Sequence, residues 1–368
     1  MNNAIRVLHV VTHMNRGGLE TMIMNYYRHI NREKVQFDFL VHRNGRADYD
    51  DEIESMGGKI YRFPRLIPWS PSYKKKLHAF FLAHSEYHIV HVHQDCLSSV
   101  ILREAQKCDI PVRIAHSHST SQDKDWKYLV KLFYKRSIPK YATTLFACGK
   151  NAGEWMFGGA AYKVLNNAID AAAYRYNDKE AATVRKRLGI REDDFVVGHV
   201  GRFSPPKNHK FLIDIFSCIA KKDMNTRLLL VGDGQLRPDI EKRVEILGLR
   251  DKVIFTGVQK DVDQMMQAMD AFVFPSLYEG LGIVAVEAQA SGLPCFISSD
   301  VPGDCIITDL VRVISRNDSP EYWADKILEA RKEKRCSSCS EVVHAGYDIA
   351  ENAKWLQNYY LAQQKAGN

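Results

Sequence analysis

The sequence predicts an α/β protein made of two doubly wound domains, and three observations lead to that prediction. The chain has 368 residues, more than one hydrophobic core usually fills. Short apolar runs alternate with amphipathic helical stretches, the pattern of parallel strands joined by helices. In each half, a glycine-containing turn follows an early strand, at 13–18 and at 201–207. Ligands bind at such strand ends in open α/β sheets.

The composition is that of a soluble globular protein. Apolar residues make up 45% of the chain and charged residues 26%, and no apolar run approaches the ~20 residues that cross a bilayer. The N-terminus leads directly into a strand, so we expect no secretory leader and a cytoplasmic location. The eight cysteines are then reduced thiols. Cys336 and Cys339 have zinc or redox spacing but lack a second pair, and we interpret them as a coincidence.

The first half is expected to form a parallel sheet covered by helices on both faces. It begins with a strand at 5–12 and a helix at 19–29. Strands that are buried on both faces are apolar throughout. Further runs of this kind lie at 35–41, 59–62, 88–93, 112–116 and 143–148.

Gly17 and Gly18 lie between the first strand and its helix. A strand, two glycines and a helix allow the backbone to approach a phosphate closely, although the full G-x-G-x-x-G fingerprint is absent. Taken alone, the pair is a weak indication of a nucleotide site.

Histidines end two later strands, His91 with His93 and His116 with His118. Alternate residues of a strand point the same way, so each pair shares one face. For His91 and His93 we expect packing or hydrogen bonding at the strand end. Because no Cys or carboxylate lies at ligand spacing beside these histidines, no metal site is expected.

Residues 60–141 carry the whole charge excess, with 14 Lys and Arg against 6 Asp and Glu, while the rest of the chain has 37 against 38. Within this region, 126–141 interleaves basic residues with Trp126, Leu129 and Phe133. An interfacial helix against anionic lipid needs this combination. The alternative is a helix whose apolar stripe faces the core and whose basic face is solvated. No nucleic-acid-binding motif is present, so no such partner is expected.

The segment 163–170 is predicted to connect the domains. A helix at 178–188 then opens the second half, and another is expected at 211–220. The strand candidates of this half lie at 195–200, 227–231, 252–257, 271–274, 295–298 and 311–314. The predicted domains are residues 1–166 and 167–345, followed by a helical tail at 346–368.

Arg202 and Lys207 flank the turn after the strand at 195–200. Two cations fixed at the carboxyl end of a strand can neutralise a diphosphate leaving group, a task that Mg²⁺ performs in other transferases. The alternative is that both side chains are simply solvated in a loop.

Glu279 and Glu287 bracket the change from strand to helix within 270–294. A helix that starts near Ile283 offers unpaired N–H groups and a positive dipole end to a phosphate. Glu287, one turn further, is suited to accept hydrogen bonds from sugar hydroxyls. The alternative is two solvated acids around an ordinary turn.

The stretch DAFVFPSLYEGLGIVAVEAQASGLP resembles the E-x7-E signature of retaining glycosyltransferases of family four, together with its surrounding FPS, VEA and SGLP elements. That family has the GT-B architecture, in which two Rossmann-like domains face each other across a cleft. Gly17 with Gly18, and Arg202 with Lys207, match further family motifs in order. Pro206 and Asn208 replace the commoner Glu and Gly, and Asn166 and Ala168 replace the usual Pro and Gly of the domain connection.

The resemblance implies a role for each matched residue. Glu279 and a cleft histidine would act at the donor sugar; His116 fits that position best, with His118 as the alternative. Gly17 and Gly18 would lie between the donor diphosphate and the acceptor. The apolar stripe of the last helix suggests that it returns to the N-terminal domain, as in GT-B proteins. The donor-binding residues implied are Arg202, Lys207, Glu287, Gly282, Ile283, Val284, Gly257 and Val258.

The predicted function is therefore transfer of a hexose from a nucleotide-diphosphate sugar, UDP favoured, with retention and without a metal or other cofactor. The N-terminal domain would bind a lipid-linked or saccharide acceptor in surface polysaccharide assembly, with an anionic membrane surface meeting 126–141. Two alternatives remain: a nucleotide-sugar epimerase that uses the histidines as acid and base, and a non-catalytic subunit that binds nucleotide sugar.

Overall fold

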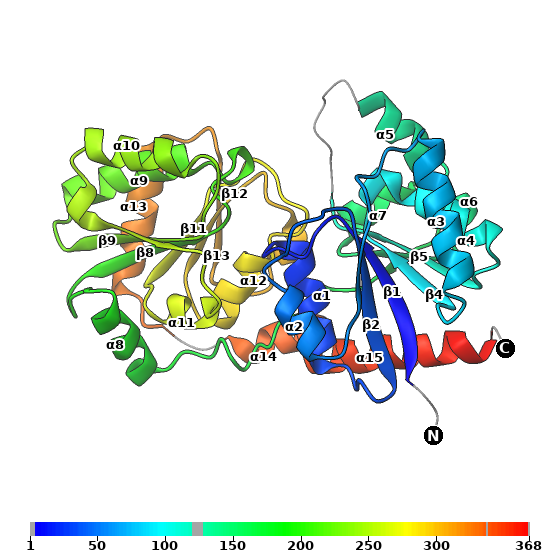
Figure 1. The fold of residues 1–368 in the computed structure, drawn as a ribbon. Helices are drawn as coiled ribbons and strands as arrows, with labels where there is room; N and C mark the ends of the chain where they lie inside the picture. Colours follow the sequence, from blue (N-terminus) through cyan, green and yellow to red (C-terminus); the bar gives the residue numbers. More distant parts are fainter. Residues whose placement is uncertain (1–3, 120–127, 336–337, 367–368) are drawn as a thin grey trace. The chain divides into compact units, whose positions relative to one another are not determined.

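The computed structural model describes residues 4–119, 128–335 and 338–366, and it forms two compact units. Unit 1 is Met1–Ile169 with Ile349–Asn368, and unit 2 is Asp170–Asp348. Each unit contains a parallel sheet with helices on both faces (Figure 1). The predicted α/β class with two doubly wound, Rossmann-like domains is confirmed.

Unit 1 has a sheet in which every pairing between neighbouring strands is parallel. The first strand lies in the middle, and the order reverses beside it, which is the mark of a doubly wound sheet. In sheet order, the strands of the described residues are β3 (Ile60–Arg62), β2 (Val35–Val41), β1 (Ile5–Val11), β4 (Ile89–Val92), β5 (Val112–Ser117), β6 (Thr144–Ala147) and β7 (Lys163–Val164).

The helices of unit 1 pack on this sheet from both sides (Figure 1). They are α1 (Gly18–His29), α2 (Asp50–Ser55), α3 (Pro71–Ala83), α4 (Ser98–Lys107), α5 (Tyr128–Lys135), α6 (Ile138–Tyr141), α7 (Lys150–Phe157) and α15 (Ile349–Ala366).

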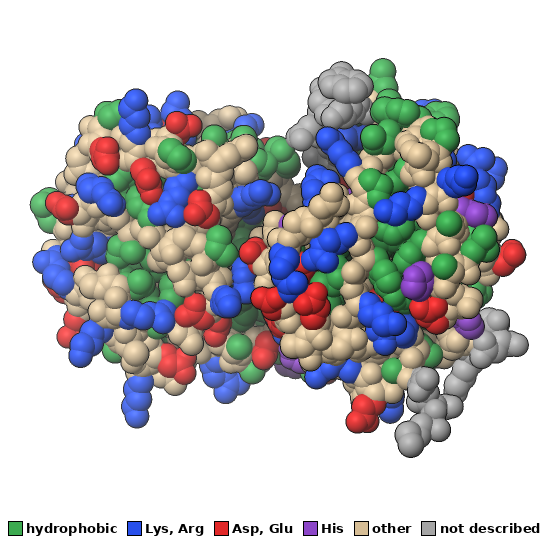
Figure 2. Space-filling view, in the orientation of Figure 1, with side chains coloured by type: hydrophobic (Ala, Val, Ile, Leu, Met, Phe, Trp, Pro, Cys, Tyr) green, Lys and Arg blue, Asp and Glu red, His purple; other side chains and the backbone are tan. Residues whose placement is uncertain are grey.

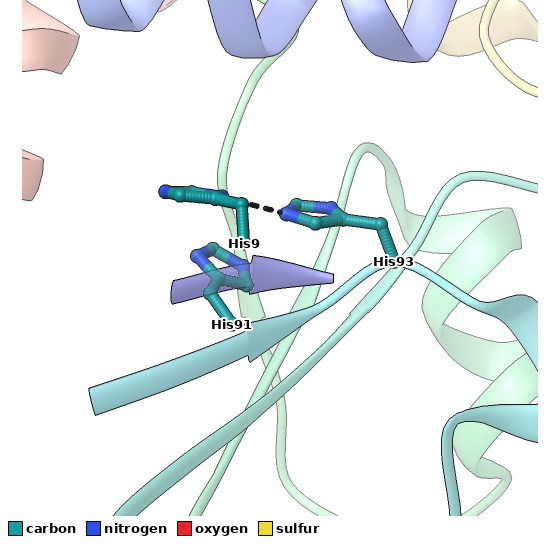
Figure 3. Close-up of side chains that lie close together, drawn as sticks. All are labelled: His9, His91 and His93. Atoms are coloured by element: carbon teal, nitrogen blue, oxygen red, sulfur yellow. Dashed lines mark hydrogen bonds between the residues drawn. The ribbon is translucent and has the colours of Figure 1, made fainter. Parts of the chain in front are cut away.

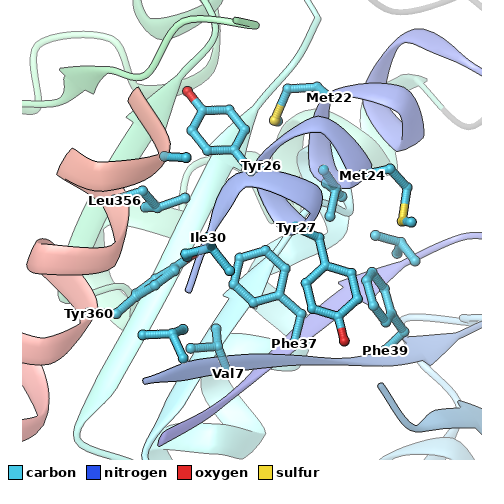
Figure 4. Close-up of a cluster of buried hydrophobic side chains, with 14 of the residues drawn as sticks. Val7, Met22, Met24, Tyr26, Tyr27, Ile30, Phe37, Phe39, Leu356 and Tyr360 are labelled. Atoms are coloured by element: carbon cyan, nitrogen blue, oxygen red, sulfur yellow. The ribbon is translucent and has the colours of Figure 1, made fainter. Parts of the chain in front are cut away.

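The last helix belongs to unit 1. In α15, Leu356 and Tyr360 are buried against α1 and the neighbouring strands, where they meet Tyr26 and Phe37 (Figure 4). The rings of Tyr360 and Phe37 lie edge to face, 6.0 Å apart, a favourable aromatic geometry. The apolar stripe seen in the sequence of this helix therefore closes one face of the first sheet.

Unit 2 repeats the plan with a second parallel sheet. In sheet order its strands are β10 (Val253–Gly257), β9 (Thr226–Val231), β8 (Phe195–Val200), β11 (Ala271–Phe274), β12 (Cys295–Ser298) and β13 (Val311–Ile314). Its helices are α8 (Asp178–Arg187), α9 (His209–Lys222), α10 (Arg237–Ile246), α11 (Val262–Gln267), α12 (Ile283–Ala290), α13 (Pro320–Glu329) and α14 (Cys339–Val342). The side chains of α9, α10 and α13 share one buried core with the sheet.

The basic stretch 126–141 differs from the single helix predicted, because the structure has two helices there, α5 and α6. Pro139 lies in the first turn of α6; proline lacks an N–H and suits a helix start rather than an interior. Leu129 and Phe133 of α5 are 76% and 69% exposed, so the alternative of a core-facing apolar stripe is wrong for these two side chains. Trp126 lies outside the described residues.

Two further predictions concern the Cys336–Cys339 pair and membrane-spanning helices. Cys336 of the Cys336–Cys339 pair is outside it. Among the helices of residues 4–119, 128–335 and 338–366, none combines the length and the apolar character that a membrane crossing requires.

Candidate active site

In unit 2, two loops meet at the carboxyl ends of the neighbouring strands β8 and β11. One runs from Gly201 to Asn208 and the other from Pro275 to Gly282. The Leu277 N–H donates to the Pro206 carbonyl at 2.7 Å, and the Asn208 side-chain amide donates to the Pro275 carbonyl at 3.2 Å. These two bonds hold together loops that are far apart in the sequence.

Asn208 explains how the first loop tolerates an unusual sequence. Its φ is +53°, in the left-handed region where glycine is commonest and asparagine is among the few side chains that enter readily. A β-branched or large residue would be strained at this position. The replacement of the family's usual glycine by asparagine therefore preserves the turn and adds the bond to Pro275.

Lys207 and Glu279 form an ion pair where these loops touch. The Lys207 Nζ lies 2.8 Å from the Glu279 Oε1, and the side chains are only 18% and 12% exposed. The Nζ also lies 4.7 Å from the centre of the Phe274 ring, within the range of a cation–π contact. Arg202, in the same loop, is exposed to solvent. The structure thus places the two predicted residues Lys207 and Glu279 side by side, with Arg202 at the surface.

The second loop ends at the N-terminus of α12. Gly282 is the N-cap residue with φ of +83°, and a Cβ there would lie 3.1 Å from the Phe274 ring. Glycine is therefore required both by conformation and by space. The N–H groups of Ile283 and Val284 open the helix and, like all first-turn donors, lack intrahelical acceptors. Together with the helix dipole they form a site suited to an anion.

Glu287 lies one turn into α12 and is buried, with 7% of its surface exposed. Burial raises the pKa of its carboxyl group to about 7, and the nearby Asp263 charge raises it further. A hydrogen bond from Tyr174 and the positive charge of Lys207 both lower this pKa. Lys207 therefore lies close enough to Glu287 for its positive charge to influence the pKa of the carboxyl group. A buried carboxyl group with few partners is able to accept hydrogen bonds from hydroxyl groups of a ligand.

The end of β10 forms the remaining predicted part of the donor site. Gly257 has φ of +71° and its carbonyl accepts from the Gly232 N–H at 2.8 Å. Val258, next in the chain, is 55% exposed. Beside them the Arg237 guanidinium lies 5.7 Å from the Phe255 ring and is paired with Asp233 and Glu241. This flat, partly apolar strand end can accept the face of a ring.

The remaining predicted residues belong to unit 1. Gly17 is the N-cap of α1, and Gly18 is its first residue. His116 is on β5 and is 2% exposed, with no hydrogen-bond partner for either ring nitrogen in the described part of the chain. His118 follows the strand and is partly exposed; its Nε2 lies 2.9 Å from the Nδ1 of His93.

Sequence reasoning missed two side chains that the structure brings to these places. Tyr174 reaches Glu287 from the segment before α8, and no motif marks it in the sequence. His9 lies on β1 directly beside His91 of β4. In the sequence, His9 is noticeable as a polar residue inside an otherwise apolar strand. Its contacts with the other histidines can be known only from the order of the strands in the sheet.

Comparisons with known proteins show the family to which the chain belongs. Residues 180–347 match the family described as glycosyl transferases group 1, and residues 16–172 match glycosyltransferase family 4. The glycosyltransferase EpsF of Bacillus subtilis is 37% identical over 368 residues, covering 96% of each chain. The UDP-Gal:α-D-GlcNAc-diphosphoundecaprenol α-1,3-galactosyltransferase of Escherichia coli is 22% identical over 98% of this chain and 97% of its own.

The structure of Alr3699/HepE from Anabaena in complex with UDP and glucose superimposes with a TM-score of 0.80 and 18% identity, over 97% of this chain and 99% of that one. At this identity the likeness concerns the fold. The chain belongs to the group 1, family 4 glycosyltransferases, and it has their GT-B fold of two Rossmann-like domains.

Proposed function

We propose that this glycosyltransferase transfers a hexose from a UDP-sugar to a lipid-linked or polysaccharide acceptor, with retention at the anomeric carbon. The observation that supports this most strongly is the Lys207–Glu279 ion pair beside the start of α12. It puts a cation, an anion and free helix N–H groups within one small area of unit 2. A UDP-sugar needs all three, since it combines a diphosphate with a polyol.

In this proposal the diphosphate binds to Lys207, Arg202 and the N–H groups of Ile283 and Val284. As the bond between the sugar C1 and the diphosphate oxygen breaks, these groups stabilise the negative charge on the leaving group. A new bond forms between C1 and the acceptor oxygen, and the acceptor proton leaves with the diphosphate. Glu279, relieved of part of its pairing with Lys207, orients the sugar hydroxyls.

Glu287 would hold the ribose hydroxyls, and the strand end at Gly257 and Val258 would receive the uracil ring. Two protein cations and a helix dipole are sufficient to balance the diphosphate charge, so we propose that transfer needs no divalent ion at the diphosphate. The HepE complexes with UDP and with UDP-glucose support the choice of a UDP-sugar by analogy of fold.

A histidine of unit 1 is proposed to contact the donor sugar. The sequence favoured His116, with His118 as the alternative. His116 is 2% exposed on β5. His118 lies beyond the strand end with its Nδ1 buried and its Nε2 2.9 Å from the His93 Nδ1, so both histidines are kept as candidates. Gly17 and Gly18, at the N-terminus of α1, are proposed to lie beside the diphosphate or the acceptor.

The acceptor is proposed to be reached at a membrane surface on the cytoplasmic side. The E. coli relative is named for an acceptor linked to diphosphoundecaprenol, and unit 1 has a surface suited to anionic lipid. In it, Leu129 and Phe133 of α5 are exposed, as are Ile67 and Trp69. The Tyr134 hydroxyl donates to the Pro68 carbonyl at 3.2 Å, so these two segments are neighbours.

Basic side chains accompany this apolar surface. Lys75 and Lys76 of α3 and Arg136 after α5 are exposed. Figure 2 shows hydrophobic and basic side chains together where Figure 1 places α5. Apolar side chains flanked by cations are what an interfacial contact with anionic lipid requires. None of the matches reported above favours an epimerase or a non-catalytic subunit.

A donor screen tests the proposed function. Purified protein with EDTA is incubated with each common UDP-, GDP- and ADP-sugar, and nucleotide release is measured for wild type and for Glu287→Ala. We expect release from a UDP-sugar that survives EDTA and is lost in the variant. Release only from another nucleotide sugar, or only with added metal ion, would contradict the proposal.

A further inference from the structure

Five histidines converge on one face of the unit 1 sheet. His9 is on β1, His91 and His93 are on the adjacent β4, His116 is on β5, and His118 follows β5. His9 is directly paired with His91 in the sheet register, and His91 and His93 point to the same side because they are two residues apart. His9, His91, His93 and His116 are all at least nine-tenths buried.

Three of the five rings are packed closely in Figure 3. The His9 Nδ1 lies 3.1 Å from the His93 Nε2. The His91 and His93 rings are stacked with centres 4.4 Å apart, and the His9 and His91 ring centres are 5.1 Å apart. In His9, His91 and His93, one ring nitrogen of each residue lies within 4.8 Å of those of the other two.

Several ring nitrogens of this cluster lack hydrogen bonds. The His9 Nε2, the His91 Nε2 and both nitrogens of His116 are buried with no partner in the described part of the chain. Buried polar atoms are nearly always satisfied, and each exception calls for an explanation such as a bound ion or water. With the His118 Nδ1, which is also buried without a partner in the described residues, five such atoms lie in this cluster, which is unusual for a native protein.

A small cavity lies beside these histidine rings. Its lining includes His9, His91, His93 and His116, and apolar side chains such as Met22 and Leu356 close it. The cavity volume is about 10 Å³, close to the minimum for one water molecule and far below the several hundred Å³ of a site for an organic ligand. Only a single ion or a single water fits.

We propose that His9, His91 and His93 bind one divalent transition-metal ion of the zinc class inside unit 1. Imidazole nitrogens suit zinc, copper and nickel, whereas calcium and magnesium require oxygen ligands. Tetrahedral zinc with Zn–N bonds of 2.0–2.1 Å holds its nitrogens about 3.3 Å apart. The distance of 3.1 Å between the His9 Nδ1 and the His93 Nε2 is near that value, and a ring nitrogen of His91 lies within 4.8 Å of one on each of the other two residues.

The surroundings favour the ligand form of the rings. Neutral imidazole, the form that binds metal ions, is the form that burial favours, and these rings are buried. The His91 Nδ1 lies 2.7 Å from the Tyr360 hydroxyl. A hydrogen bond on the second nitrogen is what orients metal-bound imidazoles, and it leaves the Nε2 of His91 as the ligand atom.

The site would join two central strands to the C-terminal helix. His9 belongs to β1, His91 and His93 to β4, and Tyr360 to α15, while His116 of the next strand, β5, packs beside His91. A buried site of this kind stabilises a fold. The inference concerns unit 1 alone and is independent of the proposed sugar transfer, which needs no metal at the diphosphate in unit 2.

Metal binding to the full-length, tag-free protein tests this assignment. Wild type, His91→Gln and the control His42→Gln are purified without chelator, and zinc is measured by mass spectrometry per folded chain. The protein is then stripped with a chelator and titrated with Zn²⁺ against a chromophoric chelator, and with Co²⁺ while the ligand-field bands are recorded. His42 is a suitable control because it is also buried in unit 1, and both its nitrogens bond elsewhere, to Val11 and Tyr73.

We expect one Zn²⁺ per chain in wild type and in His42→Gln, tetrahedral Co²⁺ bands, and a melting temperature that rises with Zn²⁺. His91→Gln should bind Zn²⁺ at least about tenfold more weakly and lose the Co²⁺ bands. The inference is overturned if stripped wild type shows neither tight Zn²⁺ binding nor Co²⁺ bands, since water then fills the cavity. It is equally overturned if His91→Gln binds like wild type, or if only His118→Gln loses the metal. The wild-type titrations decide the matter even if a variant does not fold.

Discussion

The Lys207 Nζ and the Glu279 Oε1 lie 2.8 Å apart although the two residues are 72 positions apart in the sequence. Each comes from the loop after a strand, and the strands β8 and β11 are neighbours in the sheet. The pair is mostly shielded from water, so its charges act in a medium of reduced dielectric. A donor that binds there must compete for Lys207, and this competition links donor binding to the orientation of Glu279.

Substitutions of Asn208 should show how much the left-handed backbone conformation at this position contributes to the free energy of unfolding. Asn208→Ala is expected to lower the free energy of unfolding by about 2 kcal/mol, because alanine resists a positive φ and cannot bond to the Pro275 carbonyl. Asn208→Gly keeps the turn and loses only the bond, so it should cost about half as much. Urea denaturation of the three proteins measures this; equal stability of the Ala and Gly variants would show that the turn conformation is not limiting.

Glu287 should make stability depend on pH. Its pKa is raised to about 7 in the folded protein from 4.5 in the unfolded chain, so the folded state retains a proton that the unfolded chain releases. The free energy of unfolding therefore falls as pH rises through this window and levels off above it. Glu287→Gln cannot ionise and should gain up to about 3 kcal/mol relative to wild type at pH about 8.

The measurement is the difference in the free energy of unfolding between the two proteins at several pH values. Tyr174→Phe removes a hydrogen bond that lowers the Glu287 pKa, so it should move the midpoint of the pH dependence upward. A difference that does not change between pH about 5 and about 8 would mean that Glu287 titrates normally.

The affinity for the donor should also depend on the ionisation of Glu287, but it should rise with pH, whereas the stability falls. The carboxylate accepts hydrogen bonds from ribose hydroxyls better than the protonated acid does, so the Kd for UDP should rise as pH falls below about 7, by up to about tenfold per unit. Calorimetric titration of wild type and Glu287→Gln with UDP measures the effect. The variant should bind weakly with little pH dependence; an equal slope in both proteins would assign the effect to another group.

The apolar surface of α5 should control membrane attachment. Replacement of Leu129 and Phe133 by serine removes two of the exposed apolar side chains, and we expect a loss of most co-sedimentation with anionic liposomes. Met224→Ser is a matched control, because Met224 is 74% exposed but lies in unit 2. Salt should weaken the wild-type binding, and equal binding to neutral vesicles would contradict the proposed role of the basic residues.

Most strands could be predicted from the sequence because their residues are buried on both faces. The runs at 35–41, 195–200, 271–274, 295–298 and 311–314 coincide with β2, β8, β11, β12 and β13 residue for residue. In a parallel sheet covered by helices, burial makes the whole strand apolar, so its ends are visible as changes in polarity.

Contacts between side chains from distant segments of the chain could not be predicted in the same way. The hydrogen bond between Tyr174 and Glu287 joins α12 to a stretch without a motif, and the contact of His9 with His91 depends on β1 lying next to β4. The helix expected over 126–141 is divided between Lys135 and Ile138, and Pro139 lies in the first turn of the second helix; a proline inside an apolar and basic pattern is a local signal of such a break. The residues of the donor site were chosen by resemblance to a family, and their roles stay predictions.

The affinity for UDP of wild type and Lys207→Met is the measurement to make first, with Lys210→Met as the control. Lys210 lies three residues further on and is exposed at the start of α9. Loss of a charge-assisted contact with the diphosphate costs about 1.5–3 kcal/mol, so calorimetry should show a Kd about 10- to 150-fold higher for Lys207→Met and unchanged for Lys210→Met. If Lys207→Met binds UDP within about twofold of wild type, the diphosphate does not bind at the Lys207–Glu279 pair.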